Sequence, residues 1–168
     1  MVPVDLLGVR LELPANTPIV LLREREGRRR VLPIYIGGPE AAAIAYALEG
    51  VVPPRPLTHD LLKTVIEELG GRLDRVVVVD MREHTYYAEL HLVVGGAPHA
   101  VSSRPSDSIA LAVRAGAPIF VAEHVLDEHG QEPEEEEPEE EAETAEEEIL
   151  EEFRDFIDSV SPEDFAGE

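Results

Sequence analysis

The order of expected strands and helices predicts an α+β fold with a mixed, largely antiparallel sheet. Three strands are expected within residues 1–36 before any helix, and three more follow between residues 73 and 101, joined by tight turns. Helices are inserted singly among these strands, whereas a doubly wound fold alternates strand and helix throughout. An acidic linker and a C-terminal amphipathic helix are expected after the folded part.

Apolar runs bounded by glycine and proline place the expected strands. They span residues 4–13, 19–22, 31–36, 73–81, 85–94, 98–101 and 118–122. Pro33 lies inside one of these runs, and proline cannot donate a ladder hydrogen bond, so this strand is expected at a sheet edge or at a bulge.

Three helices are expected from their start signals. One begins with Pro39 as its first residue, one follows Thr58 as its N-cap, and one begins at Pro105 and stops at Gly116. The second helix is expected to bury a stripe of four apolar residues: Leu62, Val65, Ile66 and Leu69. The first helix carries small residues at 41–45, which predicts that another element packs very close to it.

Composition limits the class of protein. A chain of 168 residues with 43% hydrophobic content can bury one full core, and two cores are not expected. It contains no cysteine, which excludes a disulfide scaffold and any thiolate site. No basic leader with an apolar run opens the chain, and no stretch of about 18 apolar residues occurs. We therefore expect a soluble cytoplasmic protein that does not contact a membrane.

The net charge of −22 is unevenly distributed. Residues 1–127 carry a net charge of −3, and residues 128–168 carry −19. We therefore divide the chain into a folded domain at 1–128, an acidic low-complexity linker at 129–147 and an amphipathic C-terminal helix at 148–168. The apolar residues of that helix are Ile149, Leu150, Phe153, Phe156, Ile157 and Val160. Their stripe predicts packing on the chain's own core, on a sister subunit or on a separate protein partner.

Five arginines gather around an expected turn at Gly27: Arg23, Arg25, Arg28, Arg29 and Arg30. Such a cluster suits a nucleic-acid backbone. The alternative is a solvated hairpin tip whose charge is balanced by Glu24 and Glu26, and the sequence favours this interpretation.

Three helix starts carry residues suited to phosphodiester chemistry. They are Glu40, then His59 and Asp60 after Arg55, then Ser106 and Asp107 after Arg104. Carboxylates with a histidine are what metal-assisted hydrolysis requires, because the metal activates water and an acid or base moves protons. Each acid alone is also a good match for the positive end of a helix dipole. Whether the three helix starts meet in space is left open by the sequence.

Three blocks, in this order and spacing, resemble a known family. They are residues 32–37 with Glu40 and Ala41, residues 55–61, and residues 103–112. Together they resemble the signature blocks of the bifunctional nuclease domain, a bacterial domain shared with plant defence-related nucleases. The resemblance covers about residues 4–128, and three ordered blocks are far more specific than one.

The resemblance implies an α+β domain that self-associates as a dimer or higher homo-oligomer and cleaves both DNA and RNA. Within the matching blocks we assign catalytic roles to His59, Asp60 and Asp107, with His59 as general acid or base. The phosphate-binding residues are Arg104, Ser106 and Arg55, and the metal ligands are Asp107, Asp60 and Glu40. The expected cofactor is Mg²⁺ or Mn²⁺, with no organic cofactor.

The sequence thus predicts a metal-dependent nuclease for DNA and RNA with low sequence specificity. The alternative is a non-catalytic module that binds an anion or a partner and carries a tethered acidic tail. The nearly neutral folded part suits this alternative, since nonspecific nucleic-acid binders are usually basic. In a third interpretation the protein is a structural homo-oligomer, and the three motifs only cap helices.

Overall fold

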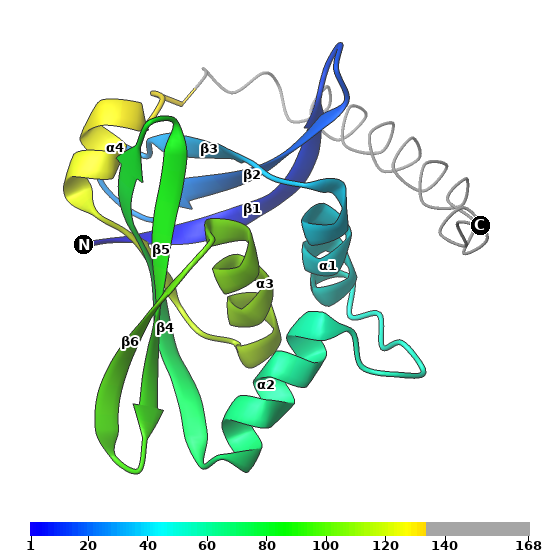
Figure 1. Cartoon of the computed structure of the whole chain (residues 1–168). Helices are drawn as coiled ribbons and strands as arrows, with labels where there is room; N and C mark the ends of the chain where they lie inside the picture. Colours follow the sequence, from blue (N-terminus) through cyan, green and yellow to red (C-terminus); the bar gives the residue numbers. More distant parts are fainter. Residues whose placement is uncertain (134–168) are drawn as a thin grey trace. The chain divides into compact units, whose positions relative to one another are not determined.

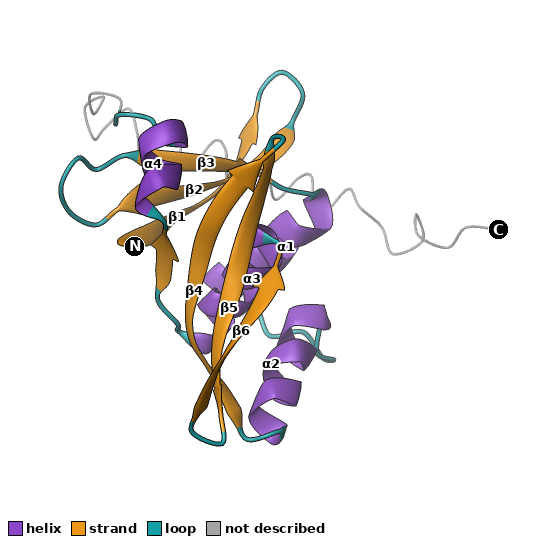
Figure 2. Ribbon diagram, turned by 60° about the vertical axis from the view of Figure 1, so that its left-hand side comes forward, coloured by secondary structure: helices purple, strands orange, loops and turns teal. Residues whose placement is uncertain are grey.

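A seven-stranded sheet forms the framework of the protein (Figures 1 and 2). The computed structural model describes residues 1–133. The strands are β1 (Val2–Glu12), β2 (Thr17–Glu24), β3 (Val31–Tyr35), β4 (Gly71–Arg82), β5 (Thr85–Val94), β6 (Ala97–Ser103) and β7 (Ile119–Val121). Their order is β3-β2-β1-β7-β4-β5-β6, and every neighbouring pair is antiparallel except β4 and β7. The predicted mixed, largely antiparallel α+β fold is confirmed.

Four helices complete this part of the chain: α1 (Gly38–Leu48), α2 (Thr58–Glu68), α3 (Pro105–Ala115) and α4 (Glu123–His129). Helix α3 contacts α1, α2, β4 and β5, and is the central helix of the fold (Figure 1). Its residues Ile109, Ala110, Leu111 and Ala112 are buried, and they belong to one core with apolar residues of the sheet. Alternation along β4 places Val76 and Val78 in this core.

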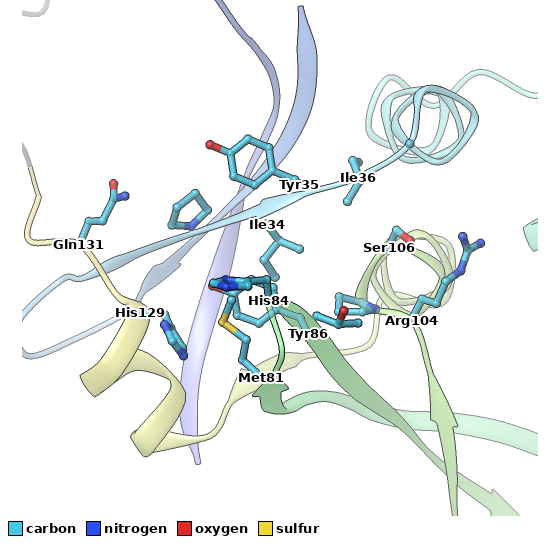
Figure 3. A pocket seen from close by; sticks show the side chains of 14 residues that line it. Ile34, Tyr35, Ile36, Met81, His84, Tyr86, Arg104, Ser106, His129 and Gln131 are labelled. Atoms are coloured by element: carbon cyan, nitrogen blue, oxygen red, sulfur yellow. The ribbon is translucent and has the colours of Figure 1, made fainter. Parts of the chain in front are cut away.

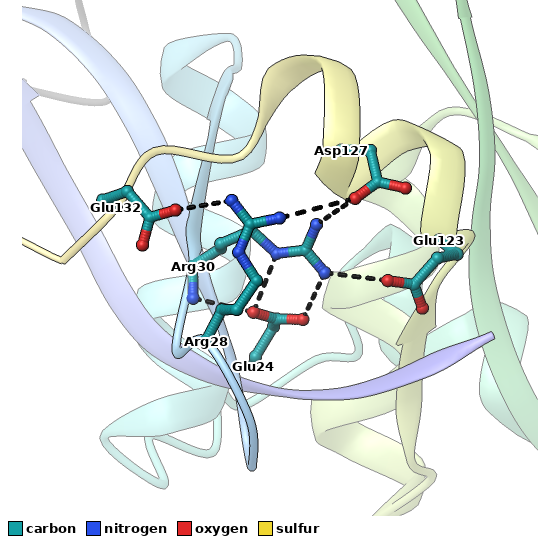
Figure 4. Close-up of polar contacts among 6 residues, drawn as sticks. All are labelled: Glu24, Arg28, Arg30, Glu123, Asp127 and Glu132. Atoms are coloured by element: carbon teal, nitrogen blue, oxygen red, sulfur yellow. Dashed lines mark hydrogen bonds and ion pairs between the residues drawn. The ribbon is translucent and has the colours of Figure 1, made fainter.

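A buried charged network, shown in Figure 4, fixes the turn between β2 and β3 against α4. The side chains of Glu24 and Arg30 are only 4% and 3% exposed. Arg30 donates two side-chain hydrogen bonds to Glu24, at 2.9 Å from Nε and 2.6 Å from Nη2. It also reaches Asp127 at 2.6 Å and Glu123 at 3.0 Å, and both lie on α4. A buried arginine is tolerated here because carboxylates surround it.

Three more arginines of this turn make contacts within the chain, whereas Nε of Arg23 is buried without a hydrogen-bond partner among the described residues. Arg25 contacts Asp5 at 2.8 Å, and Arg28 contacts Glu132 at 2.6 Å. Arg29 donates to the Arg25 carbonyl oxygen at 2.7 Å. These contacts agree with the interpretation of a charge-balanced turn, although the balancing carboxylates come mostly from outside the turn.

Helix α2 differs from its prediction in two ways. Its N-cap is Leu57, not Thr58, because the Asp60 carboxylate accepts the Leu57 backbone N–H at 2.8 Å and Thr58 is already helical. The expected apolar stripe is not buried: Leu69 is 73% exposed, Val65 44% and Leu62 36%. Ile66 alone among those four packs against the described core, because α2 rests on α3 and β4 by only one side.

Smaller differences concern the ends of elements. Helix α1 begins at Gly38, so Pro39 is its second residue, and β1 and β4 extend a few residues beyond the predicted strands. Pro33 lies on β3, an edge strand, as expected.

Helix α4 was not predicted, and the chain stays in contact with the sheet after it. Val31 and Gln131 exchange two backbone hydrogen bonds of 2.8 Å. Residues 129–133 of the expected linker therefore belong to the described unit, whereas the rest of the linker and the expected helix at 148–168 lie outside the described residues. Among the described helices, none is long and apolar enough to span a membrane.

We predict that Glu24→Gln lowers the free energy of unfolding at pH 7 by about 3 kcal/mol, because it removes the principal partner of a buried arginine. Hydrogen bonds from Arg30 hold the pKa of Glu24 below its usual value. The stabilisation is therefore complete above the unfolded pKa of about 4.3 and is lost as the pH falls through the lower folded pKa. Urea denaturation from pH 7 to pH 3 should show wild type and variant converging at the acid end.

The matched control is Asp5→Asn, which breaks an ion pair whose two side chains are 50% and 49% exposed. It should change the free energy of unfolding by less than about 1 kcal/mol. Equal effects of the two substitutions would contradict a special role for the buried network.

Candidate functional site

The starts of α1 and α3 are joined by one arginine. Arg104 is the N-cap residue of α3, and its guanidinium donates to Asp107 at 2.7 Å from Nε and 3.0 Å from Nη2. The same Nη2 lies 3.0 Å from an oxygen of Glu40, in the first turn of α1. One guanidinium therefore bridges carboxylates from two helices.

The start of α2 joins this cluster through His59. Its Nε2 lies 3.0 Å from Oδ1 of Asp107. An ionised carboxylate can only accept hydrogen bonds, so Nε2 carries the proton in this pair. His59 is only 8% exposed, although it lies in the first turn of α2. Asp107 thus fixes the orientation of a nearly buried imidazole.

Asp107 remains ionised at the centre of these contacts. Burial disfavours its charge, but hydrogen bonds from Arg104 and His59 outweigh burial and hold the pKa of Asp107 below its usual value. The positive end of the α3 dipole acts in the same direction. An ionised Asp107 can stabilise a positively charged imidazole beside it.

Asp60 is next to His59 in sequence but has different partners. Its Oδ1 accepts from Nε of Arg114, in the last turn of α3, and its Oδ2 accepts the Leu57 N–H. Burial opposes ionisation of Asp60 and is the largest single influence, yet the hydrogen bonds from Arg114 and from the Leu57 backbone together with the charge of Arg114 lower its pKa. Asp60 therefore caps α2 and anchors it to α3.

The two remaining predicted phosphate ligands differ in their surroundings. Ser106, in the first turn of α3, is 6% exposed and lines a cavity together with Arg104. Arg55 lies in the loop between α1 and α2, where it is exposed and outside the contacts described above. The structure thus brings four of the predicted residues together: Glu40, His59, Arg104 and Asp107. Ser106 directly precedes Asp107 in the chain.

Gly37 makes room for one member of this cluster. A Cβ atom at this position would lie 2.2 Å from Oε2 of Glu40. Any larger residue would push the Glu40 carboxylate from its place beside Arg104. This explains why a glycine precedes α1 in the first signature block.

The fit to a divalent cation is incomplete in this conformation. The guanidinium of Arg104 sits between the carboxylates of Glu40 and Asp107, and Asp60 is held by Arg114. Within residues 1–133, no group of three or more His, Asp or Glu side chains is arranged to hold a metal ion. Binding of a cation to Glu40, Asp60 and Asp107 stays a prediction that requires the arginines to release these carboxylates.

Sequence reasoning missed the cavity that adjoins this cluster (Figure 3). Its volume is about 640 Å³. Besides Arg104, Pro105 and Ser106, its lining includes Tyr35, Met81, His84, Tyr86, His129 and Gln131. The sequence offered one hint of this cavity, because Tyr35 lies in the first signature block. His129 and Gln131 lie outside all three blocks, so no motif pointed to them.

The matched family model covers most of the described chain. Residues 20–134 match the model of the bifunctional nuclease domain. This range contains Glu40, His59, Arg104 and Asp107, and the whole lining of the cavity.

Individual relatives fall into two groups. An uncharacterized protein of Mycobacterium tuberculosis is 48% identical over 162 residues, which is 96% of each chain. Bifunctional nuclease 1 of Arabidopsis thaliana is 32% identical over 120 residues, and bifunctional nuclease 1 of Oryza sativa is 27% identical over 125 residues. These matches cover 69% and 73% of this chain but only 37% and 38% of the plant proteins. The family match over residues 20–134, together with these relatives, shows that the chain belongs to the bifunctional nuclease domain family.

Proposed function

We propose that this domain is a nuclease that hydrolyses phosphodiester bonds in DNA and RNA with little sequence preference. The observation that carries the proposal is the chain of contacts from His59 through Asp107 to Arg104 at the joined helix starts. It combines a proton-transfer group, its orienting carboxylate and a cation at one place. The plant relatives named bifunctional nucleases support the same reaction class.

In this proposal His59 is the general acid or base. Asp107 holds Nε2–H, which leaves Nδ1 to take a proton from the attacking water, and the charge of Asp107 stabilises the imidazolium that forms. Arg104 is 65% exposed, so its guanidinium is accessible to a phosphate at the positive end of α3. Ser106 supplies a hydroxyl donor in the same helix turn.

Low sequence preference follows from the groups involved. A guanidinium, a hydroxyl and the first amides of a helix recognise phosphate, which every nucleotide shares. Water as the nucleophile requires no 2′-hydroxyl, so both DNA and RNA are substrates.

The proposal includes the divalent cation that the sequence predicts. Glu40, Asp60 and Asp107 would hold Mg²⁺ or Mn²⁺, which would neutralise phosphate charge and activate water. Arg104 and Arg114 would have to release the carboxylates that they now contact.

The second candidate is an anion-binding or partner-binding module without catalysis. It is favoured by the net charge of −3 over residues 1–127, since nonspecific nucleic-acid binders are usually basic. In that case Arg104 and Ser106 bind an anion, and the acidic tail recruits a protein partner. Self-association and a cytoplasmic location belong to both proposals.

We predict that His59→Ala and Asp107→Asn each lower kcat for cleavage of labelled single-stranded RNA and DNA by about 10²–10⁴-fold, because each disables proton transfer. His99→Ala is the matched control, since His99 is exposed on β6. Circular dichroism should show that all three variants are folded. If cleavage persists in both His59→Ala and Asp107→Asn, the activity belongs to a contaminant or to another site. If the wild-type protein shows no cleavage, the binding module is favoured.

We also predict that cleavage requires Mg²⁺ or Mn²⁺ and stops in EDTA, as expected when a cation neutralises the phosphate. Glu40→Gln should raise the Mg²⁺ concentration needed for half-maximal activity. Full activity in EDTA that still depends on His59 and Asp107 would contradict the metal assignment, and cleavage would then rest on the acid–base pair and Arg104.

A further inference from the structure

The cavity beside Arg104 has the size of a ligand site and is open to solvent. Its volume of about 640 Å³ falls within the range of about 300–1,000 Å³ that is typical of small-molecule sites. Four separate segments form its wall: β3 with the residues that follow it, the β4–β5 turn with the adjoining strand ends, the start of α3, and the end of α4 with Gln131. In Figure 3, Arg104 and Ser106 stand at one side of the cavity and His129 at the other.

One end of the cavity is suited to an anion. Arg104 and Ser106 line it at the start of α3, where the first helix amides lack partners within the helix. Ser106 is 94% buried, and within residues 1–133 its hydroxyl takes part in no hydrogen bond. The buried side-chain polar atoms without a partner in residues 1–133 are Nε of Arg23 and Nε of Arg75, so the Ser106 hydroxyl itself is open to the cavity and can bond to water or to a ligand there. This hydroxyl is an observation independent of the helix dipole, and it points to a bound ligand.

The remainder of the cavity is suited to a flat aromatic group. Tyr86 and Met81 provide aromatic and sulfur surfaces, and Ile34 adds apolar area. Tyr35 follows Ile34 on β3, so its ring points to the opposite face, where its hydroxyl donates to Glu12 at 2.7 Å. The ring of Tyr86 meets that of His129 edge to face, with centroids 6.0 Å apart. His84, His129 and Gln131 place hydrogen-bonding groups around these surfaces. Nucleobases stack on aromatic faces and present polar edges, so they match this lining.

We propose that this cavity binds a single unpaired nucleotide of the substrate, with its phosphate at Arg104 and Ser106 and its base against Tyr86. The proposal rests on the nuclease function and specifies the substrate of that site. A base paired in a duplex cannot enter a cavity, so the enzyme acts on single strands or on bases flipped out of a duplex. Because Arg104 also contacts Asp107, the bound phosphate lies next to the acid–base pair.

The direct test is calorimetric titration of the full-length protein with adenosine 5′-monophosphate, adenosine and inorganic phosphate. The monophosphate should bind at least about tenfold more tightly than either part, because it alone fills both ends of the cavity. Tyr86→Leu should weaken its binding by about tenfold, the effect of losing the stacking face. His84→Ala should also weaken its binding, because it removes a hydrogen-bonding group of the lining. His84 is exposed in the β4–β5 turn, so its replacement leaves the core intact if Tyr86→Leu fails to fold.

Tyr87→Leu is the matched control. Tyr87 follows Tyr86 on β5, so it points to the opposite face of the sheet, where the Arg82 guanidinium lies 5.3 Å from its ring. Binding of the monophosphate should be unchanged in this variant. Equal losses in His84→Ala and Tyr87→Leu, or no binding to wild type at 1 mM (about the weakest affinity that a specific site is expected to show), would overturn the proposal.

A second measurement separates this proposal from the nuclease function. The wild-type protein is assayed on bis(p-nitrophenyl) phosphate, on a single-stranded oligonucleotide and on the same sequence in a duplex. The single strand should be cleaved at least about tenfold faster than the duplex. Cleavage of the single strand and the duplex at equal rates would refute the nucleotide cavity while leaving the nuclease intact. Nucleotide binding without cleavage of any substrate would refute the nuclease alone.

Discussion

Close packing of α1 against α3 is the constraint on which the candidate site depends. Both helices carry buried alanines, among them Ala41 and Ala45 on α1 and Ala110 and Ala112 on α3. Small side chains let two helix backbones approach closely. The helices start near each other as a result, so that one guanidinium reaches both Glu40 and Asp107. Larger residues in this contact would separate the carboxylates without touching any charged group.

Two aspartates at neighbouring helix starts serve different purposes. Asp60 is occupied by Arg114 and by the backbone of Leu57, so its charge stabilises the attachment of α2 to α3. Asp107 shares its oxygens between Arg104 and a nearly buried His59. Both acids match the helix dipole, yet only Asp107 is coupled to a group that can transfer protons at neutral pH. The same helix-start motifs can therefore both cap helices and supply groups for the proposed proton transfer.

The cavity extends the site beyond the three signature blocks. Its far wall includes His129 and Gln131, which stay in place because α4 is bound to Arg30 and because Gln131 pairs with β3. The buried Glu24–Arg30 network thus acts on the site from a distance, by holding one side of the cavity. Phosphate recognition at α3 and base recognition near Tyr86 would then be combined in one continuous space.

The sequence by itself determined the α+β class, most strands, the three helix starts to within a residue and the polar residues that each start carries, because local periodicity and capping residues carry this information. That these starts meet in space was decided by the tertiary structure. It also identified the family, since ordered blocks are specific. Only the tertiary structure decided that His59 is buried against Asp107, that Asp60 pairs with Arg114, that α2 leaves Leu69 and Val65 exposed, and that α4 closes one side of a cavity. The physical reason is that these outcomes depend on contacts between residues distant in the chain, such as His59 with Asp107, which no local pattern records.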